Sequence, residues 1–154
     1  MSSQSPADAE LQRRLVGTYR LASVESIDED GDVQHPFGES PDGLMTYSAE
    51  GYMVTILARS DRTDFPDGDI MGGTDAERVT AFLTASAFAG HFEVLDGKVV
   101  YNLEAATFQN WKGTTQVRDF ELTEDGLVLK TPFIMMSGKL RRSVVRLTRL
   151  PLGG

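Results

Sequence analysis

The sequence lacks cysteine altogether, which excludes disulfide bonds, thiolate nucleophiles and sulfur-ligated zinc or iron–sulfur sites. Its two histidines, His35 and His91, have no second ligand at metal-binding spacing, so we expect neither a metal nor another cofactor. No stretch approaches the roughly 18 apolar residues that a membrane-spanning helix needs. Positive charge is scarce as well, because 15 Lys and Arg against 23 Asp and Glu give a net charge of −8. Nucleic acid and membrane surfaces are therefore poor partners.

The 154 residues, of which 40% are hydrophobic and 25% charged, have the size and composition of one soluble domain. The start of the chain has neither the basic nor the apolar stretch of a secretion signal, so we expect a cytoplasmic protein. Residues 1–14 are predicted to form an N-terminal segment, with a short helix that ends near Leu15. Residues 15–150 are predicted to form the single domain.

Most of that domain shows the period of two that is typical of β-strands. Turn signals with glycine, such as Ala49-Glu50-Gly51 and Asp96-Gly97, separate the alternating stretches. The pattern predicts a strand that begins at Gly17 and further strands over residues 44–48, 52–58, 91–95, 98–107, 114–122, 127–133 and 140–149.

One long connection and one helix interrupt the strands. Residues 59–73 form a connection longer than the usual 4–6 residues. Thr74-Asp75-Ala76-Glu77 is a capping box, and apolar residues follow it at helical spacing. We therefore expect a helix from about Asp75 to Ala89, ended by Gly90 and packed against the strands.

About eight antiparallel strands with one substantial helix predict an all-β fold, either an up-and-down barrel or a sandwich. Nearly every connection is a short hairpin, which favours the antiparallel up-and-down β-barrel, with one flanking α-helix and the short N-terminal helix. Such a barrel is either filled by its own side chains or wide enough for one small ligand. The function therefore depends on which residues point inward.

Several segments, at residues 15–25, 41–47, 50–53, 88–94 and 110–122, together resemble the lipocalin-like domain family of the calycin barrels. The resemblance extends from about Leu15 to Leu150. Tyr19 stands where that superfamily has the tryptophan of Gly-x-Trp, and Arg149 stands where an arginine of the last strand packs over that ring. The resemblance implies a cup for a small, mostly apolar ligand and an association with secondary-metabolite pathways, without fixing a reaction.

The predicted strand over residues 114–122 places Gln116 and Arg118 on the same face as Phe120. A buried charge without a partner is costly, so Arg118 needs a carboxylate, water, or a carbonyl or carboxylate of a ligand. Glu25 is the natural internal partner, because alternation puts it on the inward face of its strand. Ligand anchoring and an internal ion pair with Glu25 both remain open.

Other candidates for the barrel interior are aromatic, apolar or small. Tyr101 is predicted to point inward, where its phenol donates either to a ligand oxygen or to a neighbour in the core. Trp111, in a loop at the rim, either gates the mouth or covers the end of the barrel. The remaining residues that we expect to contact a ligand are Ser23, Tyr47, Met53, Leu103 and Phe120.

Two functions fit this pocket. In the first, the protein binds a small apolar compound whose polar end contacts Gln116 and Arg118. In the second, it is a cofactor-independent cyclase or isomerase, in which Arg118 or Tyr101 stabilises an oxyanion and Glu25 acts as the base. The sequence decides neither between these functions nor between a monomer and a homodimer.

Overall fold

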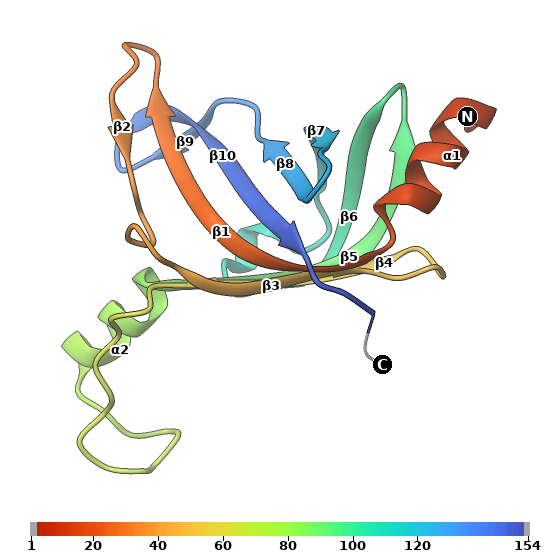
Figure 1. The fold of residues 1–154 in the computed structure, drawn as a ribbon. Coiled ribbons are helices and arrows are strands. Elements are labelled where there is room, and N and C mark those ends of the chain that lie inside the picture. Colours follow the sequence, from red (N-terminus) through yellow and green to blue (C-terminus); the bar gives the residue numbers. More distant parts are fainter. Residues whose placement is uncertain (1–2, 153–154) are drawn as a thin grey trace.

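The computed structural model describes residues 3–152, and its main feature is an antiparallel sheet that closes into a barrel of eight strands (Figure 1). The first two residues of the expected segment 1–14 lie outside this range. In chain order the elements are α1 (Pro6–Leu15), β1 (Gly17–Asp28), β2 (Val33–Gln34), β3 (Asp42–Tyr47), β4 (Tyr52–Ala58), α2 (Asp75–Leu83), β5 (Ala85–Leu95), β6 (Lys98–Ala106), the 3₁₀ helix η1 (Gln109–Trp111), β7 (Thr115–Leu122), β8 (Gly126–Lys130), β9 (Ile134–Met136) and β10 (Lys139–Arg149).

The barrel is closed by β1, which pairs with β3 on one side and with β10 on the other. The ring runs β1-β3-β4-β5-β6-β7-β8-β10, and the short strands β2 and β9 are added beside β1 and β10. Except for the closing pair β1–β10, strands that are neighbours in the ring follow each other along the chain, with β2, β9 and the long α2-containing connection inserted between three of these pairs. This architecture confirms the predicted all-β, up-and-down barrel, in which closure removes the exposed edges of the sheet.

Glycine-containing turns connect the strands where the sequence predicts them. Asp96 and Gly97 link β5 to β6 with φ angles of 53° and 73°, the conformation that a two-residue hairpin turn requires. The turn between β3 and β4 contains Gly51, with a φ of 94°. These turns set the register of the strands that they join.

Helix α2 begins where the capping box predicts, but it ends earlier than expected. The side chain of Thr74 accepts from the backbone of Glu77, and the Glu77 side chain accepts from the backbone of Thr74. The helix ends at Leu83, so the predicted extent to Ala89 is wrong, and β5 already begins at Ala85. Residues 85–90 pair with β4, and the hydrogen bonds of that ladder outweigh a weak local helical pattern.

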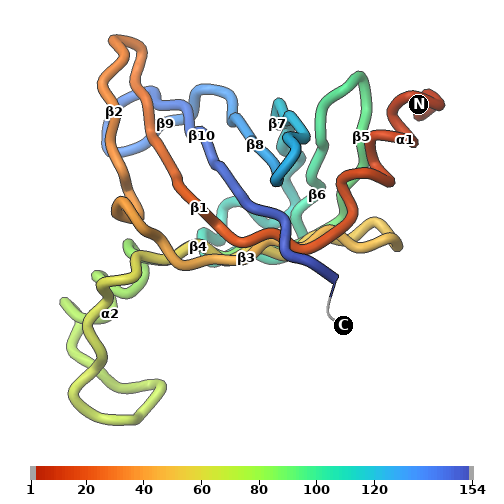
Figure 2. Tube along the Cα trace, in the orientation of Figure 1, coloured from red at the N-terminus to blue at the C-terminus, as the bar shows by residue number. Residues whose placement is uncertain are grey.

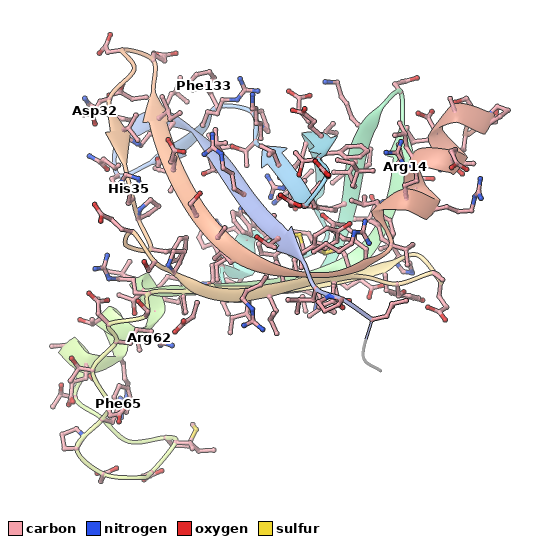
Figure 3. The ribbon with its side chains drawn as sticks, in the orientation of Figure 1. Arg14, Asp32, His35, Arg62, Phe65 and Phe133 are labelled. Atoms are coloured by element: carbon pink, nitrogen blue, oxygen red, sulfur yellow. The ribbon has the colours of Figure 1, made fainter. Side chains whose placement is uncertain are left out.

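The expected packing of this helix against the barrel is also wrong. Helix α2 and the segment before it extend away from the strands (Figures 1 and 2), and none of the residues of α2 is buried. Arg62 and Phe65 lie on this extension (Figure 3), and Arg62 donates to the Thr84 hydroxyl group over 3.2 Å, next to the start of β5. The apolar residues that suggested a packed face, Val79 and Phe82, remain 57% and 49% exposed.

Helix α1 covers one end of the barrel, which we call the α1 end. Its Leu15 is fully buried in the core. The carboxylate of Asp8 accepts hydrogen bonds from the backbone N–H groups of Asp96 and Gly97, at 3.0 and 2.9 Å. We call the opposite end, which carries the β1–β2 hairpin, α2 and η1, the far end. No helix in residues 3–152 is long and apolar enough to span a membrane.

Candidate functional site

Strand β7 directs Gln116 and Arg118 toward the inside of the barrel, as its alternation predicts. Arg118 is 8% exposed and Gln116 is half-buried, whereas Val117 between them is exposed. Their partners across the β6–β7 ladder are Tyr101 and Val99, which are both fully buried. An amide and a guanidinium thus lie among apolar side chains.

The surroundings of Arg118 are aromatic rather than acidic. Its Nη2 donates to Oε1 of Gln116 over 2.6 Å. The guanidinium carbon lies 5.3 Å from the ring centre of Tyr101 and 5.9 Å from that of Phe88, within the range of cation–π attraction. None of the ion pairs formed within residues 3–152 includes Arg118.

A β-bulge in β1 reverses which side chains face the interior. Ala22 has no partner on β10, because the register shifts between Leu21 and Ser23. Leu21 is buried before the bulge, and Val24 is buried beyond it. Ser23 and Glu25 therefore lie on the outer face of the barrel, and the inward orientation predicted for both of them is wrong.

The alternative in which Glu25 forms an internal ion pair with Arg118 is consequently wrong as well. Glu25 instead pairs with Arg146 of β10, and both side chains contact solvent. The catalytic alternative loses its expected base by this correction, because a carboxylate on the outer wall cannot reach a ligand inside the barrel.

Tyr101 and Tyr47 form a buried pair beside Arg118. Their hydroxyl groups are hydrogen-bonded to each other, and their side chains are 0% and 1% exposed. Burial raises the pKa of Tyr101 and raises that of Tyr47 well above its usual value, while the charge of Arg118 opposes both increases. Both phenols are therefore neutral near neutral pH, so each keeps its hydroxyl proton. The hydrogen bond between them uses one of these two protons, and the other is free to be donated elsewhere.

Aromatic rings continue from Arg118 toward the far end. Phe88 packs edge-on against Trp111, with ring centres 5.5 Å apart, and Trp111 packs in the same way against Phe108 at 5.7 Å. Trp111 thus covers the inner rings from the rim. Phe88 falls within the predicted helix and therefore outside the predicted site, although Phe88, Phe92 and Val94 alternate as on a strand.

The other predicted contact residues belong to the packed interior. Met53 and Leu103 are 0% and 2% exposed, and both are part of the central hydrophobic cluster. Phe120 is half-buried against that cluster. These residues are part of the packed core of the barrel. That they also contact a ligand remains a prediction.

Two surface hollows lie outside the barrel. One is formed by residues 64–70 in the segment before α2, and the other lies between β1, β3 and β4, where Arg20, Leu44 and Ile56 line it. Neither is lined by Gln116 or Arg118. Because paired strands form a continuous wall and α1 covers one end, a ligand has to reach Arg118 through the far end.

A closed, antiparallel up-and-down barrel of eight strands is the architecture of lipocalin-like proteins, whose interior can hold one small ligand. The chain belongs to the lipocalin-like domain family, whose model matches residues 16–150. The resemblance seen in the sequence is thereby confirmed.

One curated relative adds a named ligand. The chain is 32% identical over 92 residues to a protein of Aspergillus oryzae (strain ATCC 42149 / RIB 40) called 4'-hydroxy-3'-methoxypropiophenone carrier protein. The matched stretch covers 54% of this chain and 83% of that protein.

Proposed function

We propose that this protein binds and carries a small, largely apolar organic molecule inside the barrel, with the oxygen-bearing end of the molecule against Gln116 and Arg118. The observation that carries the proposal is Arg118 itself, a buried guanidinium surrounded by rings and an amide. A folded protein keeps such a group at a cost, and a ligand oxygen would offset that cost.

The ligand occupies the half of the barrel nearer the far end. At the α1 end, Leu15, Tyr19 and Met53 are completely buried, so this half is filled by its own side chains. Toward the far end, Leu57 and Phe88 each keep 8% exposure. Binding sites of this kind combine apolar walls with few polar groups, which is the arrangement around Arg118.

The ligand named for the relative has the matching chemistry. A hydroxy-methoxyphenyl ketone has a flat aromatic body and a few oxygen atoms, which suits a guanidinium beside stacked rings. The ligand of the present protein is of the same general class, a small aromatic compound with oxygen substituents. Its place is in a secondary-metabolite pathway, as the resemblance implies.

Displacement of a neutral fluorescent dye tests the proposal. Wild-type protein should bind Nile red saturably, and 4'-hydroxy-3'-methoxypropiophenone should displace it. In Leu57→Trp, the larger side chain should fill the interior of the barrel near the far end. Dye binding should therefore weaken by at least about tenfold, because a packed interior admits no ligand. The matched control is Ile56→Trp, since Ile56 is the preceding residue on β4 and is 49% exposed on the outer face.

Circular dichroism establishes that both variants fold. Saturable binding that is lost only in Leu57→Trp supports an internal site. If wild type binds no dye, or if Ile56→Trp weakens binding as much as Leu57→Trp, the proposed internal site is wrong.

A further inference from the structure

The two buried arginines of the barrel differ in their partners. Within residues 3–152, the charged side chains that are buried are Asp8, Asp28, Arg118 and Arg141. Asp8 is held by backbone N–H groups at the α1 end. Asp28 and Arg141 face each other at 3.8 Å, and Arg141 also donates to Ser26. Arg118 is thus the buried cation of the described residues that has no carboxylate beside it.

Within the described residues, no ion pair brings an anion to Arg118, and the groups that surround it are neutral. Strand β6 contributes Tyr101 and β3 contributes Tyr47, whose phenols stay neutral near neutral pH because burial raises their pKa values. Strand β5 contributes the ring of Phe88. The only polar contact from β7 itself is the neutral amide of Gln116.

Part of the guanidinium remains available to a ligand. A guanidinium has five N–H donors, and Gln116 receives one hydrogen bond from Arg118. In the described part of the chain, no completely buried side-chain nitrogen or oxygen lacks a partner. The remaining nitrogen atoms of Arg118 are therefore not completely enclosed by protein.

We infer that the ligand binds as an anion, an ionised oxygen acid on an apolar body, and that Arg118 selects the ionised form over the neutral one. This inference rests on the binding site proposed above. A buried cation gains far more from a charged oxygen than from a neutral one, and the planar fork of arginine fits delocalised anions such as carboxylates and phenolates. Bound acids should therefore ionise at lower pH than the same acids in water.

Matched acids and their uncharged methyl derivatives test this inference. The compounds are para-nitrophenol with para-nitroanisole, and para-nitrobenzoate with its methyl ester. Calorimetry near neutral pH gives the four affinities, and the yellow absorption of para-nitrophenolate against pH gives the pKa of the bound phenol. Wild type should prefer an anion by at least about tenfold and lower the bound pKa by about one unit.

Variants attribute the effect to one side chain. Arg118→Gln should abolish the preference for the anion while it still binds para-nitroanisole, and Arg118→Lys should keep a preference of the same sign. The control Arg146→Gln removes an arginine from the outer wall and should change neither value, since Arg146 is half-exposed and pairs with Glu25.

The outcomes separate this inference from the proposed function. A preference for only one of the two acids assigns the ligand as a carboxylate or as a phenolate. If wild type binds each neutral derivative as tightly as its acid, the inference is overturned, although the internal site stands. If none of the four compounds binds and Nile red does not bind either, the proposed function fails as well. The wild-type comparison decides the matter even if Arg118→Gln does not fold.

Discussion

The guanidinium carbon of Arg149 lies 4.7 Å from the ring centre of Tyr19, and Nη2 of Arg149 donates to the Tyr19 hydroxyl group over 2.6 Å. Arg149 also donates to the backbone carbonyl groups of Arg14 and Val16, at 2.6 and 2.8 Å. Tyr19 in turn donates to the carbonyl of Leu15. The last strand, the first strand and α1 thus meet at one ring, and tyrosine fills the place that the resemblance assigns to tryptophan.

Replacement of Arg149 should destabilise the fold. Arg149→Leu removes the cation–π contact and charge-assisted hydrogen bonds, so we expect the free energy of unfolding to fall by about 2–3 kcal/mol. Urea denaturation measures this change. Arg146→Leu on the same strand is the control, because its solvent-exposed pair with Glu25 contributes less than about 1 kcal/mol. Equal losses in both variants would refute a special role for Arg149.

The tyrosine pair should show strong coupling. Tyr47→Phe or Tyr101→Phe leaves the other buried hydroxyl without its partner, which costs about 1–2 kcal/mol of unfolding free energy in each case. In the double variant no hydroxyl group remains to be satisfied, so the loss should be smaller than the sum by about 1 kcal/mol. A double-mutant cycle from denaturation curves measures this coupling, and simple additivity would mean that the two hydroxyl groups act independently.

Gly90 should tolerate no side chain. A Cβ atom at this position would lie 2.1 Å from the backbone oxygen of Asn102, where the β5–β6 ladder shifts register. The paired backbone of Asn102 can move away only by distorting the β5–β6 ladder, so Gly90→Ala should lower the free energy of unfolding by more than about 2 kcal/mol. Gly68→Ala is the control, since a Cβ there meets nothing within 4 Å, and its effect should stay within about 0.5 kcal/mol. Thermal unfolding that is equal for both variants would contradict the close approach.

Asp8 should make stability depend on pH in the acid range. Hydrogen bonds from the backbone of Gly97, and then from Ser5 and Asp96, hold the pKa of Asp8 below its ordinary value of 3.8. A lowered folded-state pKa means that the carboxylate stabilises the fold fully above pH 3.8 and loses this effect as the pH falls through the folded-state value.

Asp8→Asn should therefore destabilise the protein more at neutral pH than well below pH 3.8, as measured by urea denaturation at both values. The other carboxylates titrate in both proteins and cancel in the difference. A difference in stability that is the same at both pH values would show that Asp8 does not act through its charge.

Much of the candidate site was predictable from a single strand. The alternation along β7 put Gln116 and Arg118 on the apolar face, and no bulge interrupts that strand between them. In β1 the same reasoning misplaced Glu25, because one extra residue at Ala22 shifts the alternation by one. A bulge depends on the register against the partner strand, which local sequence does not contain.

Turn chemistry, helix capping and the period of two are local properties, so the sequence by itself determined the hairpins, the start of α2 and the all-β barrel. Tertiary structure decided the rest. Pairing with β4 made residues 85–90 a strand, and this brought Phe88 beside Arg118. The anionic ligand is inferred because no carboxylate of residues 3–152 forms an ion pair with Arg118. That situation arises only once the ring of strands has closed and turned Glu25 outward. Such contacts join residues far apart in the chain, and their energies follow from packing and register rather than from local preference.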